Sequence, residues 1–194
     1  MRPLKAFINQ ASLRHNLDTV KQLAPNSKIM SVVKANGYGH GLINVARGLS
    51  ESDGFAVLSL NEAIDLREHG FEQDILLLEG AFEAYEISIA AKMHFNLVVH
   101  NLHQLQMIEK LKLNCPLDIH FKINTGMNRL GFNPQEAKEI LKTLQNKSHF
   151  KSITLMTHFA TADEPRGVDW QLTYLMISQS LLIFLVQLQI LHLL

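Results

Sequence analysis

The sequence contains very little cysteine and no excess of charge of either sign. Cys115 is the single cysteine among 194 residues, so no disulfide can form within the chain. Because disulfides are typical of oxidising compartments, this favours the reducing cytoplasm. The 18 basic residues balance the 18 acidic ones, which argues against a surface for nucleic acid or for an anionic membrane. The N-terminus also lacks the apolar stretch of a secretory signal peptide, so we expect a cytoplasmic protein that binds neither nucleic acid nor a membrane.

Charge is missing altogether from the last part of the chain. Residues 171–194 contain no Asp, Glu, Lys, Arg, Gly or Pro. Three explanations compete: a buried or membrane-anchoring helix, an amphipathic helix that packs on the body, and out-of-frame sequence that was never selected to fold. Residues 181–186 are strongly apolar, but Gln187, Gln189 and His192 interrupt the run. The run is therefore shorter than the roughly 20 apolar residues that span a bilayer.

The rest of the chain alternates between two hydrophobic periodicities. Short runs rich in Val, Ile and Leu indicate buried strands, and the stretches between them have the spacing of amphipathic helices. The predicted strands are residues 4–8, 29–33, 55–58, 75–78, 96–99, 117–123 and 153–156. The predicted helices are residues 12–23, 40–50, 60–69, 82–91, 102–112 and 134–145. Asn61, Asn101 and Asn133 stand at predicted helix starts, where asparagine is a favoured N-cap.

Repeated strand-then-helix units predict an α/β fold with a parallel sheet. The strands are apolar almost throughout, as parallel strands covered on both faces should be. A (β/α)8 barrel and a doubly wound sheet both fit this pattern. In either fold the functional groups collect at the C-terminal ends of the strands, so candidate site residues are expected there.

Three of the predicted strands end in segments with polar and cationic side chains. These segments contribute two lysines, an arginine, a tyrosine and a histidine, namely Lys34, Lys122, Arg129, Tyr38 and His158. A lysine held where apolar strands converge is partly desolvated, which lowers the pKa of its amine and makes it a better nucleophile. A cofactor aldehyde that is bound as a Schiff base requires a lysine of this kind.

Each of these features also has a plainer interpretation. A lone lysine at a strand end is more often a solvated cap, and a lone histidine is more often hydrogen-bonded in a core. Gly37, Gly39 and Gly41 could form a flexible turn, because their spacing matches neither a dinucleotide fingerprint nor a P-loop. No metal site is expected, since the histidines form no H-x-x-x-H or H-E-x-x-H pair, and His100 with His103 is interpreted as a helix start.

Taken together, three segments resemble the signatures of one family. Residues 31–41 read Ser-Val-Val-Lys-Ala-Asn-Gly-Tyr-Gly-His-Gly, residues 121–132 read Phe-Lys-Ile-Asn-Thr-Gly-Met-Asn-Arg-Leu-Gly-Phe, and residues 157–164 read Thr-His-Phe-Ala-Thr-Ala-Asp-Glu. In order and spacing they resemble the motifs of the N-terminal barrel of bacterial alanine racemases, over roughly residues 4–170. The first motif is shared more loosely with other pyridoxal phosphate enzymes of the same fold type, whereas the second and third narrow the resemblance to the racemases. The resemblance implies a pyridoxal 5'-phosphate-dependent isomerase that interconverts L-alanine and D-alanine for peptidoglycan precursors.

The resemblance also implies a role for each matching residue. Lys34 would form the Schiff base with the cofactor and act as one of two acid/base groups, and Tyr38 would hydrogen-bond the cofactor phosphate. Arg129 would bind near the phenolic oxygen of the cofactor and the substrate carboxylate, a task that suits a planar guanidinium. Lys122 would match a lysine that is carbamylated in many members and braces the arginine. His158 would pack against the pyridine ring.

The sequence departs from the family pattern in its last third. Six strands follow the entry strand, whereas the family barrel has eight, so we expect a partial (β/α)8 TIM-type barrel. The missing strands would carry the main phosphate loops, and the arginine partner of the pyridine nitrogen is not matched. The family's C-terminal β domain is not matched either. In the family, a tyrosine of that domain is the second base and acts across the homodimer. We therefore expect an incomplete barrel domain over residues 1–170 and an out-of-frame tail over residues 171–194.

Two alternatives to an inactive, shortened racemase remain at this point. The chain could be a non-catalytic pyridoxal phosphate-binding protein, although a complete barrel would be needed for that. It could also be a membrane-tethered module that uses residues 171–194. An open sheet with two exposed edge strands further predicts poor solubility.

Overall fold

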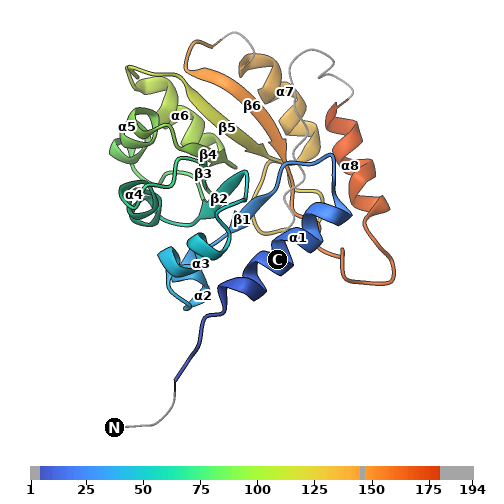
Figure 1. Cartoon of the computed structure of the whole chain (residues 1–194). Helices are drawn as coiled ribbons and strands as arrows, with labels where there is room; N and C mark the ends of the chain where they lie inside the picture. The colour runs from blue at the N-terminus through green and yellow to red at the C-terminus, as the bar shows by residue number, and fades with distance from the viewer. Residues whose placement is uncertain (1–4, 145–146, 180–194) are drawn as a thin grey trace. The chain divides into compact units, whose positions relative to one another are not determined.

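The computed structural model describes residues 5–144 and 147–179. These residues form eight helices and six strands, and at least one helix follows each strand (Figure 1). The strands are β1 (Met30–Val32), β2 (Gly54–Val57), β3 (Asp74–Leu77), β4 (Asn96–Val99), β5 (Leu117–Lys122) and β6 (Phe150–Met156). The helices are α1 (Gln10–Leu23), α2 (Lys34–Tyr38), α3 (Leu42–Gly48), α4 (Leu60–Glu68), α5 (Ala84–Met93), α6 (Leu102–Lys110), α7 (Pro134–Leu144) and α8 (Asp169–Gln179). The sheet order β1-β2-β3-β4-β5-β6 follows the sequence, which confirms the predicted α/β class and the partial barrel.

The chain divides into two compact units, with the boundary between Leu76 and Leu77 inside β3. In the first unit β1 pairs in parallel with β2, and Val32 lies opposite Ala56. All four residues of β2 are buried, as expected for a parallel strand covered on both faces. Helix α1 packs tightly on α3. The two helices approach so closely at Gly48 that a Cβ added there would lie 2.7 Å from Leu13 Cδ1.

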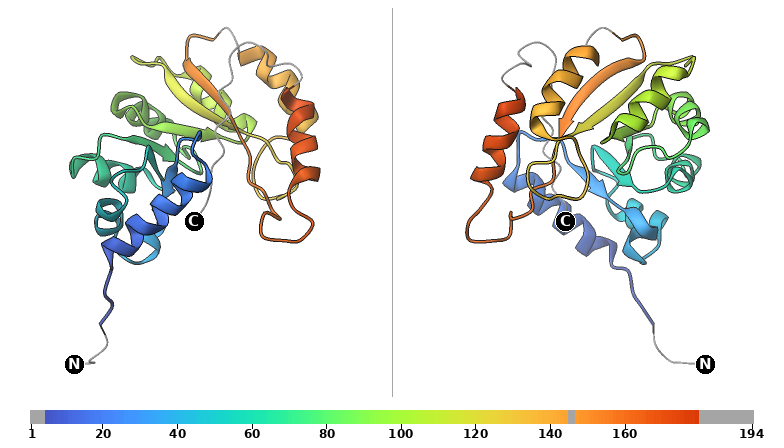
Figure 2. Two further views of the ribbon diagram at one scale, coloured as in Figure 1. Left: turned by 45° about the vertical axis from the view of Figure 1, so that its right-hand side comes forward. Right: turned by 180° about the vertical axis from the view of Figure 1, so that it is seen from behind.

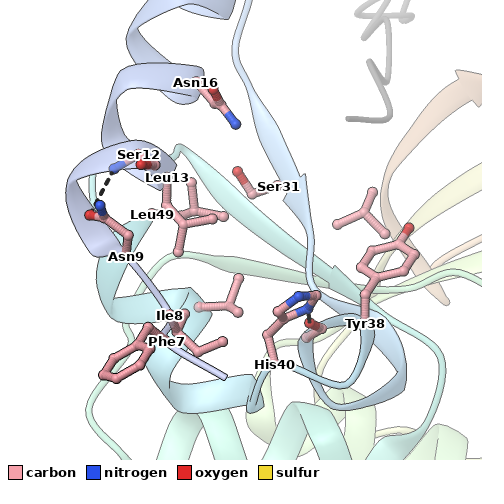
Figure 3. Close-up of a pocket in the computed structure, with 13 residues that line it drawn as sticks. Phe7, Ile8, Asn9, Ser12, Leu13, Asn16, Ser31, Tyr38, His40 and Leu49 are labelled. Atoms are coloured by element: carbon pink, nitrogen blue, oxygen red, sulfur yellow. Dashed lines mark hydrogen bonds between the residues drawn. The ribbon is translucent and has the colours of Figure 1, made fainter. Parts of the chain in front are cut away.

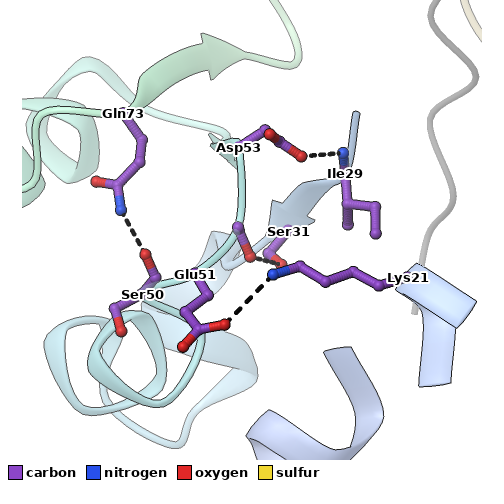
Figure 4. Close-up of polar contacts among 8 residues, drawn as sticks. Lys21, Ile29, Ser31, Ser50, Glu51, Asp53 and Gln73 are labelled. Atoms are coloured by element: carbon purple, nitrogen blue, oxygen red, sulfur yellow. Dashed lines mark hydrogen bonds and ion pairs between the residues drawn. The ribbon is translucent and has the colours of Figure 1, made fainter. Parts of the chain in front are cut away.

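Short polar contacts fix the position of β1 in the first unit (Figure 4). The backbone N–H of Ile29 donates to Asp53 Oδ2 at 2.7 Å. The hydroxyls of Ser31 and Ser52 lie 2.6 Å apart, and both residues are buried. The turn before β2 is thus joined to β1, and this sets where the chain leaves β1 and enters the segment that begins at Lys34.

In the second unit β5 is the central strand of three. It pairs in parallel with β4, where Val99 lies opposite Phe121, and with β6, where Phe121 lies opposite Leu155. Helices α7 and α8 lie side by side in this unit (Figure 2). Every β5 residue except Asp118 is buried, so polar side chains on this strand are held in an apolar environment.

His120 is the clearest such case. Its side chain is 4% exposed, and burial lowers its pKa from 6.5 to about 4, with only partial opposition from Asp118. Desolvation disfavours the charged imidazolium. The folded protein therefore holds a neutral histidine where the unfolded chain protonates near pH 6.5.

Two local predictions were wrong. Residues 5–8 of the predicted strand 4–8 form no strand, because among the described residues no other strand pairs with them to share backbone hydrogen bonds. The predicted cap Asn61 lies inside α4, which is capped instead by Ser59 through the backbone N–H of Glu62. Asn101 does cap α6, and Asn133 accepts from the backbone N–H of Gln135 at the start of α7.

Helix α8 runs through the predicted domain boundary at residue 171. Residues 180–194, which include most of the charge-free stretch, lie outside the described residues, so its out-of-frame origin stays a prediction. Among the residues that the structure does describe, no helix is both long and apolar enough to cross a membrane.

The buried neutral His120 makes the fold sensitive to acid. Above pH 6.5 neither state protonates this group, whereas between pH 6.5 and about 4 the unfolded chain binds a proton that the folded protein excludes. Stability from this group is therefore fully present above the unfolded pKa and falls as the pH drops through that window. Lowering the pH from 7 to 5 should therefore reduce the free energy of unfolding by about 2 kcal/mol through His120.

Urea titrations of wild type and His120→Gln at the two pH values measure this effect. The variant should lose about 2 kcal/mol less than wild type on acidification, whatever its stability at pH 7. His103→Gln, at an exposed position of α6, is the matched control and should keep the wild-type pH dependence. Equal pH dependence in wild type and His120→Gln would contradict the assignment.

Candidate functional site

Lys34 is the first residue after β1, and the backbone beyond it forms a left-handed turn. Ala35, Asn36, Gly37, Tyr38 and Gly39 all have positive φ, between 52° and 82°. A left-handed conformation costs roughly 1–2 kcal/mol for each residue with a Cβ. Ala35, Asn36 and Tyr38 all pay this cost within four residues, so the turn requires compensating interactions, and strain of this kind is concentrated at functional sites.

Backbone hydrogen bonds close this left-handed turn on itself. Gly37 N donates to Val33 O at 2.9 Å, and Gly39 N donates to Ala35 O at 3.0 Å. The Asn36 side chain then accepts from Leu42 N at 2.9 Å, which joins the turn to the start of α3. These bonds give the turn a defined backbone conformation and connect it to α3.

Gly37 satisfies a second requirement of the turn. A Cβ at this position would lie 2.8 Å from Val45 Cγ2, and the φ of +61° is strained for any other residue. The close approach lets α3 pack directly behind the turn.

Glu62 provides the strongest external support for the turn. Its Oε1 accepts from Asn36 N at 2.8 Å, and its Oε2 accepts from Leu58 N at 3.1 Å. Glu62 also completes the capping box of α4 with Ser59. One carboxylate thus ties the segment after β1 to the segment after β2, with charge-assisted hydrogen bonds that are stronger than neutral ones.

The turn brings Lys34 and Tyr38 together. Lys34 Nζ lies 5.9 Å from the centroid of the Tyr38 ring, and Lys34 is half-buried whereas Tyr38 is 50% exposed. Tyr38 and His40 also border a cavity of about 380 Å³, whose other side is formed by the N-terminal segment with Phe7 and Ile8 (Figure 3). The Lys34 amine therefore lies near the Tyr38 phenol ring, and Tyr38 also borders the cavity.

In the second unit, two loops carry the remaining candidates. The β5 loop (residues 123–133) follows Lys122, the last residue of β5, which is 6% exposed. Asn124 Oδ1 accepts from Gly126 N and Asn128 N, both at 3.0 Å. These bonds shape the loop that bears Arg129, whose side chain is exposed.

The β6 loop (residues 157–168) carries His158, which is half-buried. It is tied to the β5 loop by two threonine hydroxyls, since Thr125 Oγ1 and Thr157 Oγ1 lie 2.7 Å apart. Thr157 Oγ1 in turn donates to Ile123 O at 3.0 Å. The segments that contain Arg129 and His158 are therefore hydrogen-bonded to each other.

His100 directly follows β4 and lies close enough to Lys122 to be affected by its charge. Its ring Nε2 is 3.2 Å from Glu79 O, and burial lowers its pKa, an effect that the nearby charge of Lys122 reinforces. The interpretation of His100 and His103 as a helix start agrees with the cap at Asn101. No group of metal-ligating side chains is found in the described part of the chain.

The structure thus brings the candidates together in two groups. Lys34 and Tyr38 share one turn of the first unit, and Lys122, Arg129 and His158 lie at the ends of β5 and β6 in the second. Sequence reasoning missed Glu62, although Ser59 with glutamate three residues later is a capping-box signature. It also missed Gln171, which was assigned to the charge-free tail.

Comparison with known proteins gives a consistent result. The sequence profile described as "Alanine racemase, N-terminal domain" matches residues 8–193. An alanine racemase of Nitrosomonas europaea is 52% identical over 174 residues, which is 88% of this chain and 48% of that protein. One of Nitrosospira multiformis is 48% identical over 168 residues, or 87% of this chain and 47% of the relative.

The solved structures agree. The biosynthetic alanine racemase of Pseudomonas aeruginosa superposes with a TM-score of 0.88 and 36% identity, over 98% of this chain and 53% of that one. The chain therefore spans about half the length of the relatives that it matches.

The support that Glu62 gives to the Lys34 turn can be measured against a matched residue. Glu86 holds the corresponding position on α5, where its carboxylate accepts from Phe82 N at 2.6 Å and Glu83 N at 3.1 Å. Both alanine variants lose a carboxylate that accepts from the two backbone N–H groups just before a helix. Only Glu62→Ala also frees Asn36 N, so it should lose about 1.5 kcal/mol more in the free energy of unfolding.

Urea titration of Glu62→Ala and Glu86→Ala measures the difference, and amide exchange at Asn36 locates it. Faster exchange at Asn36 is expected in Glu62→Ala alone. Equal losses of stability with unchanged exchange at Asn36 would show that Glu62 acts only as a helix cap.

Proposed function

Because the chain belongs to the alanine racemase family, we propose that it carries the cofactor lysine of a pyridoxal 5'-phosphate-dependent racemase that interconverts L-alanine and D-alanine. The observation that carries this proposal is the placement of Lys34, half-buried at the end of β1 and followed at once by a strained turn held by Glu62. Backbone strain of this kind is concentrated at functional sites. A reactive amine needs a fixed position, which a turn held in this way provides.

The chemistry of the residues in the first unit fits this cofactor. Pyridoxal phosphate presents an aldehyde, which condenses with a primary amine, and a phosphate dianion, which accepts hydrogen bonds. Lys34 offers the amine, and Tyr38 offers a hydroxyl that is exposed to a ligand. When bound, the cofactor withdraws electrons and makes the α-proton of an amino acid acidic.

The roles of this chain's own residues follow from their chemistry. The Lys34 amine would hold the cofactor and, once the substrate amine has displaced it there, the freed amine would remove or return the α-proton on one face of the substrate. Tyr38 orients the phosphate by hydrogen bonding. In the second unit, Arg129 is proposed to hold the substrate carboxylate, because guanidinium and carboxylate pair in bidentate fashion. His158 is proposed to pack against the ring, and Lys122 to support Arg129.

Racemisation needs an acid/base group on each face of the α-carbon. Lys34 serves one face, so a second base must come from elsewhere in the whole protein. Since the chain spans about half of its relatives, we propose that the other half of that length supplies this base. On this proposal the 194-residue chain binds the cofactor only weakly and does not racemise alanine at an appreciable rate.

For the whole protein we propose a cytoplasmic homodimer with alanine as its substrate. A single cysteine suits a reducing compartment, and peptidoglycan precursors are built in the cytoplasm. A dimer is the arrangement that the resemblance implies for the family.

Spectral titration with pyridoxal phosphate tests the proposed role of Lys34. The wild-type chain should develop a visible absorbance band that is lost in Lys34→Ala. The control Lys28→Ala removes an exposed lysine shortly before β1 and should leave the band unchanged. Tyr38→Phe should weaken cofactor binding about fivefold to tenfold, because one hydrogen bond is worth roughly 1 kcal/mol. A band of equal strength in Lys34→Ala would contradict the assignment.

The one-base proposal has its own assay. The wild-type chain saturated with pyridoxal phosphate is incubated with L-alanine, and D-alanine is measured by chiral chromatography. No D-alanine above the rate of free pyridoxal phosphate is expected. Enzymatic turnover by this chain alone would contradict the proposal that the second base lies elsewhere.

A further inference from the structure

We propose that Gln171 is a positioning residue, which locks the β5 loop and the β6 loop together and so fixes the segments that bear Arg129 and His158. Gln171 is completely buried, with a relative exposure of 0%. A buried primary amide needs partners for both its oxygen and its nitrogen. Gln171 finds these partners in both loops.

The amide oxygen is committed to the β6 loop. Gln171 Oε1 accepts from Ala160 N at 2.8 Å and lies 3.4 Å from Thr161 Oγ1. Because a backbone N–H can only donate, the atom that faces Ala160 must be the oxygen, which fixes the orientation of the amide. Gln171 Nε2 is then directed toward the β5 loop and the carbonyl of His158.

The amide nitrogen begins a chain of hydrogen bonds in one direction. Gln171 Nε2 lies 3.3 Å from Thr125 Oγ1 and 3.4 Å from His158 O. The Thr157 hydroxyl donates to Ile123 O, so the Thr125 hydroxyl must donate to Thr157 and is left to accept from Gln171. Each proton in this series of hydrogen bonds, from the Gln171 amide to the carbonyl of Ile123, thus has one acceptor.

Trp170, the neighbour of Gln171 in α8, supports the same arrangement. Its ring lies so close to Gly126 that a Cβ there would overlap it, and its Nε1 donates to Thr161 Oγ1 at 3.1 Å. The first turn of α8 therefore contacts both loops through two adjacent side chains. This placement assigns Gln171 to the folded body, although it is the first residue of the charge-free stretch.

The inference rests on the proposed function only where it treats the two loops as site loops. The locking itself is tested by amide hydrogen exchange on the full chain with Gln171→Met, which keeps the length of the side chain and removes its polar atoms. Protection at Ala160 and through the β5 and β6 loops should fall about tenfold or more, while amides within strands β5 and β6 keep their protection. Unchanged loops would overturn the proposal, and so would an equal fall in loops and strands, which would indicate a purely structural role.

Gln104 provides a matched control. It is also a buried glutamine, 5% exposed, and it also bridges strand ends, with Nε2 donating to Glu79 O at 2.8 Å and Oε1 accepting from His100 N at 2.9 Å. Gln104→Met should loosen residues 79–81 and His100 and leave the β5 and β6 loops unchanged. Loosening of the β5 and β6 loops by Gln104→Met would mean that any buried glutamine has this effect.

The conservative variant Gln171→Glu separates hydrogen bonding from packing. A protonated carboxyl retains an acceptor for Ala160 and one donor, whereas the carboxylate offers no donor to Thr125 or His158. Relative to wild type at the same pH, protection of the loops should recover as the pH falls through the raised pKa of this buried carboxyl. A loss of protection that does not depend on pH would overturn the hydrogen-bonding account.

Cofactor titration connects the locking to function. Gln171→Met should weaken pyridoxal phosphate binding several-fold, and Gln104→Met should have a smaller effect. If the loops loosen but the affinity is unchanged, the positioning role is overturned. If the wild-type chain itself binds no cofactor, the proposed function fails, and the exchange experiment alone decides whether Gln171 locks the loops.

Discussion

The interaction on which the candidate site most depends is the contact between the Glu62 carboxylate and the backbone after β1. A left-handed turn with Ala35, Asn36 and Tyr38 is unfavourable for L-residues, and its geometry persists only because surrounding groups fix it. The Glu62 carboxylate accepts from Asn36 N at 2.8 Å and from Leu58 N at 3.1 Å. Through this contact the start of α4 determines where the chain leaves β1, and hence where Lys34 and Tyr38 are placed.

A comparable arrangement recurs in the second unit with a neutral group. There a buried amide, Gln171, is hydrogen-bonded to the loops after β5 and β6. In both units a side chain from the first turn of a helix holds the backbone that follows a parallel strand. Since functional groups of such folds lie at these strand ends, side chains at helix starts contribute to positioning the candidate site residues.

The sequence predicted the general architecture well because hydrophobic periodicity reflects burial. All six strands after the N-terminal segment were located, and β2 and β4 are buried at every residue, as a continuous apolar run implies. Prediction failed where geometry depends on distant partners. Residues 4–8 look like a strand, but strand structure requires a neighbour. The positive φ of Ala35 and Tyr38 has no signature in residue type, and a count of charges could not show that Gln171 is buried among polar loops.

Chemical trapping reports directly whether Lys34 is the amine that binds pyridoxal phosphate. The full chain is incubated with the cofactor, reduced with borohydride and digested, and the modified peptides are identified by mass spectrometry. A single stable pyridoxyl group is expected on Lys34. Modification spread over exposed lysines such as Lys28, or concentrated on Lys122 with Lys34 unmodified, would contradict this assignment.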